Sequence, residues 1–184
     1  SSKVLFDIYS SFLPGGAFAN TNVASMVEMA KAHFPTRPGT ARWNLVISHA
    51  KRKHINRDCW MKNVQGETMP CKLSDEYVQR IYRGCPLIGC KNEKGVFNGG
   101  FYNVVDFTST HLHIQDIETT EELTIPIELS TYFRLGWAIT FHSSQGRSLI
   151  ETTRIHDTTS RFFTPIHLAL GISRVVSRNL IDLC

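Results

Sequence analysis

The strongest constraint on the fold is a change of pattern along the chain. Between Pro86 and Leu129, short β-branched and aromatic runs are separated by turn signals at NEKG, NGG and ETTEE, which is typical of small antiparallel strands. Before and after this segment, apolar runs alternate with helical patterns, as expected for a mostly parallel sheet. The sequence therefore predicts an α/β domain that is interrupted by a compact β-barrel insertion.

The segments outside the insertion can be assigned one by one. Strands are predicted at 43–49, 134–140, 147–155 and 179–183. Helices are predicted from an N-cap at Asn20 or Thr21, after the first of these strands, at 74–84 and at 164–176. The third of these helices is predicted because Ser74 suits an N-cap and Gly84 suits a helix end.

Composition places the chain among ordinary globular proteins. Its 184 residues, 42% of them hydrophobic, can bury a sizeable core, and a net charge of +4 permits nucleic-acid binding without requiring it. The five cysteines include no CxxC pair, which indicates a reducing intracellular compartment, whether nucleus, cytoplasm or viral replication site. No apolar run approaches the ~20 residues of a membrane span, so no membrane partner is expected.

A zinc site can be drawn from the pattern, but it matches poorly. The gap between the two cysteines and the HxH pair fit no standard finger; the candidate ligands are Cys85, Cys90, His111 and His113. Buried thiols and strand histidines are the simpler interpretation, and no metal site is assigned.

Polar residues crowd the end of a predicted core strand in the segment TFHSSQG, residues 140–146. Loops at the C-terminal ends of parallel strands collect function, because strand ends and helix N-termini converge there. The hydroxyls, the imidazole and the backbone N–H groups of this loop suit phosphate oxygens. The alternative is that the polar cluster merely caps a short helix that follows.

Two groups of basic residues are further candidates for phosphate contacts. Arg174 and Arg178 are four residues apart on one predicted helical face, and arginine reaches phosphate with a planar head that carries several donors. A second group of basic residues lies at the start of the helix predicted after the strand at 43–49, where the helix dipole disfavours cations. This group comprises Lys51, Arg52, Lys53, His54 and Arg57. For both groups, a solvated charged face is the alternative.

The 184 residues contain no GxxxxGK[ST] pattern, and therefore no P-loop that could hold the phosphates of ATP. If this chain acts on ATP, it does so as the second half of a site.

In this order, the segments resemble the C-terminal half of superfamily-1 DNA helicases of the RecD/Dda-like group. In that group a strand ends in a pattern close to AYAITVHKSQGxT, and this chain keeps Ala138, Ile139, Thr140, His142, Ser144, Gln145 and Gly146. The next motif of the group resembles YVALSRV, and the chain keeps Ser173, Arg174 and Val175. Weaker matches to the group lie upstream, at Asn56, Gly84, Asn92, Asn98, Gly99 and Val104.

The resemblance covers residues 43–184, and residues 1–42 match only loosely. It implies a second RecA-like motor domain, with a mostly parallel sheet of the P-loop-NTPase type flanked by helices, in residues 1–84 and 133–184. A small SH3-like β-barrel would be inserted at 85–132. The chain would then be part of a longer protein whose N-terminal RecA-like domain binds most of the ATP and Mg²⁺.

The resemblance also implies roles for individual residues. Arg174 takes the place of the arginine finger, a catalytic residue that reaches the γ-phosphate held by the other motor domain. The segment that faces the nucleotide would be Gln145, Gly146 and Arg147. The backbone of single-stranded DNA would be contacted, largely without regard to base sequence, by Thr140, His142 and Ser143, with Ser48 and His49 as weaker candidates.

Three positions depart from the pattern of the group. Ser143 replaces the usual lysine, which removes one cation from the DNA path. Gly171 replaces an alanine, which is a tolerable change in a tight helix. Arg147 stands where the group has an apolar residue, although more distant RNA and DNA helicases of superfamily 1 carry QGRE there. Arg147 is therefore either a second phosphate-facing arginine or a surface residue.

Taken as a whole, the resemblance implies the C-terminal motor domain of an ATP-dependent DNA helicase. Such an enzyme translocates on single-stranded DNA, here in the 5′ to 3′ direction, and unwinds duplex DNA. Without a P-loop the 184-residue chain is not expected to hydrolyse ATP by itself. The alternatives are a non-catalytic module that binds nucleic acid or docks a protein, and an RNA helicase domain, which the QGR segment suggests.

Overall fold

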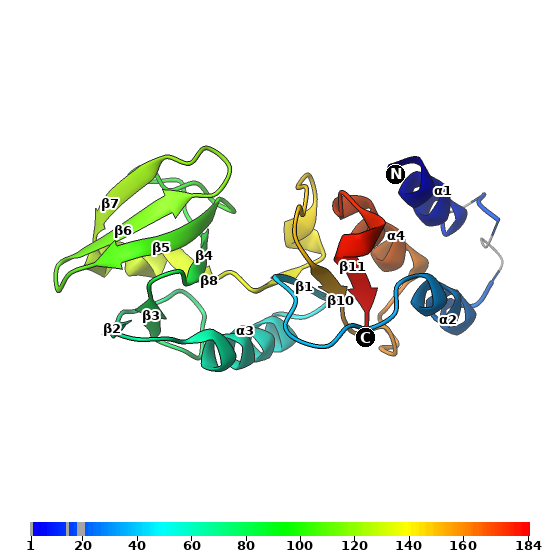
Figure 1. Ribbon diagram of the computed structural model, residues 1–184, viewed down its shortest axis with the longest axis horizontal. Coiled ribbons are helices and arrows are strands. Elements are labelled where there is room, and N and C mark those ends of the chain that lie inside the picture. Colours follow the sequence, from blue (N-terminus) through cyan, green and yellow to red (C-terminus); the bar gives the residue numbers. More distant parts are fainter. Residues whose placement is uncertain (1, 14, 18–20) are drawn as a thin grey trace. The chain divides into compact units, whose positions relative to one another are not determined.

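The computed structural model describes residues 2–13, 15–17 and 21–184, and it contains two compact units (Figure 1). Unit 1 extends to Arg52 and resumes at residues 139–184, whereas unit 2 comprises residues 53–138. Along the sequence, unit 2 is therefore an insertion into unit 1. The limits predicted for an inserted barrel, 85 and 132, lie inside unit 2 and stay a prediction.

The sheet of unit 1 has four strands in the order β11-β10-β1-β9. These strands are β1 (Trp43–Val46), β9 (Ala138–Thr140), β10 (Thr153–Ile155) and β11 (Ile181–Leu183). The central strand β10 pairs in parallel with both β1 and β11. Every residue of β1, β9 and β11 is buried, as in parallel sheets that are covered on both faces. This arrangement confirms the predicted α/β class with a parallel sheet.

Three helices accompany this sheet in unit 1, namely α1 (Ser2–Ser11), α2 (Val23–His33) and α4 (Pro165–Arg174). Helix α4 contacts both α1 and α2, and α2 also contacts β11 (Figure 1). The N-cap of α2 is Asn22, whose side chain accepts the N–H of Ser25. The prediction of Thr21 as the N-cap was wrong, and the other predicted N-cap, Asn20, lies outside the described residues.

Helix α4 approaches the sheet closely because residue 171 is a glycine. A Cβ atom at Gly171 would lie 2.6 Å from Ile155 Cδ1 and 3.3 Å from Phe141 Cε1. Ile155 is fully buried in β10, so a larger residue at position 171 would require the packed Ile155 side chain to shift. The glycine that replaces an alanine of the resembling group is therefore explained by close helix–sheet packing.

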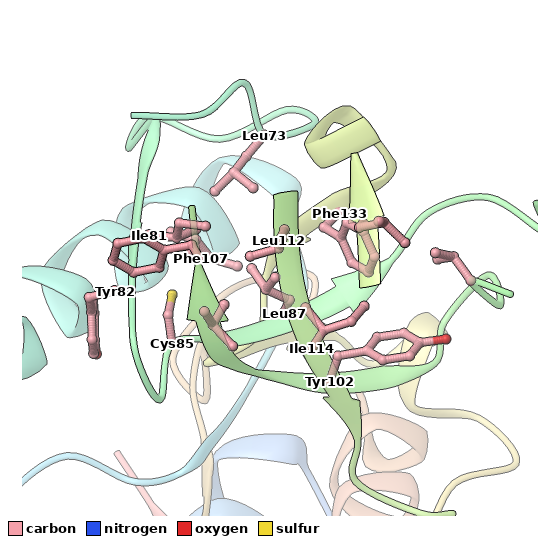
Figure 2. Packing of buried hydrophobic residues seen from close by; sticks show 14 of the residues in the cluster. Leu73, Ile81, Tyr82, Cys85, Leu87, Tyr102, Phe107, Leu112, Ile114 and Phe133 are labelled. Carbon is pink, nitrogen blue, oxygen red and sulfur yellow. The ribbon is translucent and has the colours of Figure 1, made fainter. Parts of the chain in front are cut away.

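Unit 2 is built around an antiparallel sheet of five strands in the order β7-β6-β5-β4-β8. Its strands are β4 (Pro86–Gly89), β5 (Phe101–Phe107), β6 (His111–Asp116), β7 (Glu122–Pro126) and β8 (Phe133–Leu135), with the short helix η1 (Ile127–Tyr132) between the last two. The inner faces of these strands supply one apolar core, in which Leu87, Tyr102, Leu112, Ile114 and Phe133 are labelled in Figure 2. The predicted series of small antiparallel strands is confirmed.

The helix predicted at 74–84 is wrong. This segment forms turns and then strand β3 (Arg80–Tyr82), which pairs antiparallel with β2 (Thr68–Pro70). Ile81 is buried in the core of unit 2 (Figure 2), and Asp75 adopts a φ of 52° that ends any helix. Burial of the Ile81 side chain in a two-stranded pair outweighs the helix propensity of the segment.

Helix α3 (His49–Asn63) begins in unit 1 and continues into unit 2, where it carries a buried amide. Asn56 is fully buried, and its Nδ2 donates to Glu76 Oε1 and to the Leu135 carbonyl, both at 3.0 Å. Its Oδ1 accepts the N–H of Ala138 at 2.8 Å. One side chain thus ties α3 to the 76 loop and to the segment that leads into β9.

Neither a membrane span nor the zinc alternative occurs in the described part of the chain. No helix there has the length and apolar character that crossing a bilayer requires. No group of three or more His, Cys, Asp or Glu side chains there is placed to hold a metal ion. The four-ligand zinc alternative is therefore wrong: Cys85 is fully buried in the core, whereas His111 is exposed and bonded to Thr110.

The buried amide leads to a stability prediction. Replacing Asn56 with alanine removes three hydrogen bonds and leaves the buried Ala138 N–H and Leu135 carbonyl without partners. We expect Asn56→Ala to lower the free energy of unfolding by about 3 kcal/mol, as urea titration followed by circular dichroism would measure.

The matched control is Asn63→Ala at the other end of the same helix. Asn63 makes a single bond to the Cys59 carbonyl, so its loss should cost less than about 1 kcal/mol. Equal costs for the two variants would contradict the special role of Asn56.

Candidate nucleotide and nucleic-acid interface

The ends of the strands in unit 1 converge at one edge of the sheet. Phe141, directly after β9, donates its N–H to the carbonyl of Val46 at the end of β1. His156 and Cys184, directly after β10 and β11, donate theirs to Leu45 and Ile155. Each of these bonds is 3.0 Å long. In open parallel sheets, ligands bind beyond the C-terminal ends of the strands, so this edge is the candidate site.

The loop after β9 folds back on its own hydroxyl groups. Thr140 Oγ1 accepts the N–H of Ser143 at 3.2 Å and lies 2.9 Å from Ser143 Oγ. Ser144 Oγ donates to the carbonyl of Phe141 at 2.7 Å. These bonds surround the short helix η2 (His142–Ser144), whose N-cap residue Phe141 makes no side-chain capping bond, and the His142 side chain is exposed. The loop is thus locally rigid and still presents an imidazole to solvent.

An aromatic group fixes this loop to the start of α4. The ring of Phe141 makes edge contacts with Phe163 and His167, at centroid distances of 6.1 and 5.0 Å. His167 completes a capping box with Thr164, whose side chain accepts the N–H of His167. Burial lowers the pKa of His167, which keeps its ring neutral in this packing.

Backbone bonds join the two motifs that carry the helicase resemblance. Leu149 donates its N–H to the Arg174 carbonyl at 2.7 Å, and Val176 donates to the Leu149 carbonyl at 3.4 Å. Leu149 and Val175 thereby form an isolated parallel bridge. The segment after TFHSSQG and the end of the ISRV segment are therefore direct neighbours.

Gly146 is the point at which the first motif turns. Its φ of 76° is strained for other residues, and a Cβ there would meet nothing within 4 Å. Both Gln145 and Gly146 are exposed, whereas Arg147 is half-buried. The N–H of Arg147 donates to the Ser144 carbonyl at 3.2 Å, so the part of this turn that is open to a ligand is the exposed backbone of Gln145 and Gly146.

The side chain of Arg174 is held by its neighbour in the helix. Its Nε and one terminal nitrogen donate to Ser173 Oγ at 3.3 and 3.2 Å, and Ser173 Oγ donates to the Leu170 carbonyl at 2.9 Å. Arg174 is the last residue of α4, where the helix dipole favours a cation. The guanidinium is therefore oriented by a hydroxyl, and no carboxylate among the residues that the structure describes forms an ion pair with it.

Arg178 does not share a helical face with Arg174, and that prediction was wrong. Helix α4 ends at Arg174, and Arg178 opens the separate short helix η3 (Arg178–Leu180). One of its terminal nitrogens lies 3.5 Å from the carbonyl oxygen of His33. The extended backbone of Ser177 between the two helices breaks the helical spacing.

The basic residues at the start of α3 do not form one exposed face. Arg52 is fully buried, Lys53 forms an ion pair with Asp75, and Arg57 forms one with Asp58. His54 lies 3.6 Å from the same Asp58. In contrast, Ser48 and His49 are exposed at the end of β1, and Ser48 Oγ accepts the N–H of Lys51 at 3.2 Å.

Three residues at this edge were not anticipated from the sequence. His156 Nε2 lies 2.9 Å from Asn44 Oδ1, and its Nδ1 lies 3.0 Å from Cys184 Sγ. Asp157 has a φ of 62° and accepts the N–H of Ile47 at 3.0 Å. The sequence could have indicated them by their position alone: His156 and Asp157 directly follow the strand predicted at 147–155, just as the TFHSSQG loop lies at the end of the strand predicted at 134–140.

The tautomer of His156 follows from its partners. Because a carbonyl oxygen can only accept, the Asn44 contact places the proton on Nε2, and Nδ1 then accepts the thiol proton of Cys184. Burial, together with nearby Lys51 and Arg154, lowers the pKa of His156 to about 4. Burial also raises the pKa of Cys184. The pair is therefore a neutral imidazole and a protonated thiol.

Sequence comparisons do not place this chain in a known group. No protein-family profile matches it, and no curated protein matches it in sequence.

Comparison of structures finds Pif1 helicases. Pif1 from Candida albicans matches with a TM-score of 0.66 and 14% identity, over 98% of this chain and 52% of that one. Bacteroides Pif1, solved with ADP-AlF3 and single-stranded DNA, matches with a TM-score of 0.64 and 14% identity, over 96% and 48%. A Pif1 from a study of unwinding at forked duplex DNA matches with a TM-score of 0.61 and 18% identity, over 87% of this chain and 42% of that one.

The chain thus spans about half the length of the solved structures that it matches. The matched parts lie in the C-terminal half of the Pif1 chains, so the chain has the fold of that half. The predicted resemblance to the C-terminal half of superfamily-1 helicases is confirmed at the level of the fold.

The neutral state of His156 leads to a prediction about pH. Its folded pKa of about 4 lies below its ordinary value of 6.5, so the unfolded chain binds more protons between these values. Stability is unaffected by His156 above pH 6.5 and falls as the pH drops toward 4. At pH 5, the loss from this residue should be about 2 kcal/mol.

The measurement is urea unfolding at pH 7.5 and pH 5 for the wild type and for His156→Gln, which cannot titrate. Other groups contribute equally to both proteins, so the wild type should lose more stability than the variant. The same loss in both proteins would refute the assignment.

Proposed function

We propose that this chain is the second motor domain of an ATP-dependent DNA helicase. The observation that supports this proposal most is the backbone pairing of Leu149 with Arg174 and Val176. It joins the backbone of Arg174 to the segment that follows the Gln145–Arg147 turn, which supports the proposal that both motifs act on one ligand. The fold shared with Pif1 helicases solved with ADP-AlF3 and single-stranded DNA supports this proposal.

In this proposal, the nucleotide lies between Arg174 and a partner domain. Arg174 acts as the arginine finger, since its oriented guanidinium can stabilise the charge that develops on the γ-phosphate. The exposed backbone around Gly146, with Gln145, follows the state of the nucleotide, and Arg147 supplies a second cation. ATP and Mg²⁺ are held mainly by an N-terminal RecA-like domain of the same, longer protein.

Single-stranded DNA would cross the sheet edge formed by the loops after β9 and β1. Thr140, His142 and Ser143 contact its backbone, with Ser48 and His49 at the neighbouring strand end. Unit 1 contains eleven Lys and Arg against five Asp and Glu, a net +6, whereas unit 2 has nine against eleven, a net −2. This separation of charge favours unit 1 as the DNA-binding part.

The part of unit 2 in residues 85–132, which contains strands β4 to β7, would be the SH3-like barrel of the resembling helicases. Translocation from 5′ to 3′ and unwinding of duplex DNA then follow from the resemblance to that group. A non-catalytic module would bind single strands without supporting ATP hydrolysis in any longer protein. An RNA helicase domain would support unwinding of RNA in preference to DNA.

The arginine-finger role predicts a large kinetic effect. In a protein that contains this chain and its N-terminal RecA-like domain, Arg174→Ala should lower DNA-stimulated kcat for ATP by about a thousandfold or more. Binding of single-stranded DNA by the same variant should be unchanged, because Arg174 is not placed on the DNA path. The 184-residue chain alone should show no turnover.

The control is Arg178→Ala, which removes an exposed arginine of η3 only four residues away. Its kcat should stay within about threefold of the wild type, the range of a surface change. If Arg174→Ala left kcat unchanged, the arginine-finger assignment would fail. ATPase activity that RNA stimulates more than DNA would favour the RNA helicase alternative.

A further inference from the structure

The loop between β10 and α4 presents an aromatic ring to solvent. Phe162 is 59% exposed, although large apolar side chains usually gain free energy by burial. The guanidinium of Arg161, itself exposed, lies 4.7 Å from the centroid of the Phe162 ring. Ile166, in the first turn of α4, is 62% exposed. Phe162 and Arg161 therefore form an exposed patch on this loop, made of an aromatic ring and an adjacent cation.

The backbone around Phe162 is fixed by local hydrogen bonds. Ser160 donates its N–H to the Asp157 carbonyl at 2.9 Å, and Phe163 donates to the Ser160 carbonyl at 2.9 Å. The N–H of Phe162 itself donates to Ser160 Oγ at 3.2 Å. The next residue, Phe163, is buried and stacks on His167 at a centroid distance of 5.8 Å. Phe162 is thus held outward by the burial of its neighbour.

This exposed ring lies close to the loop assigned to the DNA backbone. Phe163 contacts Phe141, and Phe141 directly precedes the exposed His142. Phe162 is therefore the sequence neighbour of Phe163, and His142 is the sequence neighbour of Phe141, the ring that Phe163 contacts. Two Cα–Cα spacings of 3.8 Å, the 6.1 Å between the Phe141 and Phe163 ring centroids and the length of those two side chains together put Phe162 and His142 on the order of 10–20 Å apart. An extended strand of a few nucleotides can span that distance.

The chemistry of the patch suits nucleic acid. A base can stack on an exposed aromatic ring regardless of its identity, and a neighbouring arginine can pair with the phosphate beside that base. The net +6 of unit 1 attracts a polyanion to this part of the chain. An uncharged apolar partner would gain nothing from Arg161 or from that charge.

We propose that Phe162 and Arg161 form a further contact for single-stranded DNA, in which a base stacks on Phe162 and its phosphate pairs with Arg161. This inference rests on the proposed function, because it extends the DNA path from the loop after β9. The loop contacts the backbone, whereas Phe162 contacts a base. Recognition remains tolerant of sequence, since every base offers a flat face.

The test is fluorescence anisotropy of the 184-residue chain with labelled oligonucleotides of ~12 nucleotides, a length within the range that such surfaces cover. One probe is oligo-dT, and the other has the same backbone with abasic sites. Phe162→Ala should weaken binding of oligo-dT about tenfold or more and leave binding of the abasic probe nearly unchanged. Phe162→Trp should retain wild-type affinity for oligo-dT.

The matched control is Phe97→Ala, which removes a phenylalanine of unit 2 that is 63% exposed. It should bind both probes as the wild type does. Arg161→Ala should reduce the slope of log affinity against log salt by about 0.7, the effect of one lost phosphate contact on a single strand. Phe162→Ala should leave that slope unchanged.

The outcomes separate this inference from the proposed function. If the wild type binds neither probe, the proposed DNA-binding function fails. If the wild type binds oligo-dT and Phe162→Ala binds it equally well, this inference is overturned while the proposed function stands. Equal weakening on both probes, or by Phe97→Ala, would also overturn stacking at Phe162. Circular dichroism and the Trp variant show whether each protein is folded.

Discussion

The buried amide of Asn56 is the contact on which the two-part chain depends. The chain leaves unit 1 within α3 and returns to it at the start of β9, and Asn56 bonds to Leu135 and Ala138 on the returning segment. Leaving one buried backbone group without a hydrogen-bond partner lowers the free energy of unfolding by as much as several surface ion pairs raise it. One side chain therefore joins the first and last segments of unit 2, through which the chain leaves and re-enters unit 1.

A second constraint joins the polar loop after β9 to the end of α4. The hydroxyls of Thr140 and Ser143 close the turn, and six residues after Ser143, Leu149 bonds to the backbone of residues 174 and 176. The path between the residues proposed for DNA and for nucleotide is thus a few backbone bonds, with no flexible side chain in it. Close helix–sheet packing at Gly171 holds the same two elements together from inside the core.

The sequence predicted those parts of the structure that depend on local pattern. The antiparallel series after Pro86 and the polar loop after Thr140 follow from apolar spacing and turn residues. The helix expected at 74–84 did not form because Ile81 is buried in the pairing of β3 with β2 and Glu76 bonds to the distant Asn56, contacts that no local pattern records. The neighbours His156 and Cys184 were missed because only the strand order brings the ends of β10 and β11 together.

The arginines of unit 1 show why charge in a sequence does not by itself locate a ligand. The charge of Arg154 is balanced inside the fold, since its Nε bonds to Asp182 at 2.7 Å and both side chains are largely buried. Arg174, in contrast, is oriented by the Ser173 hydroxyl, and within the described ranges of the chain no carboxylate forms an ion pair with it. A fold gains stability from the first arrangement only because the pair is hydrogen-bonded. The second arrangement leaves a fixed cation at a helix end, and its charge becomes favourable when an anion arrives.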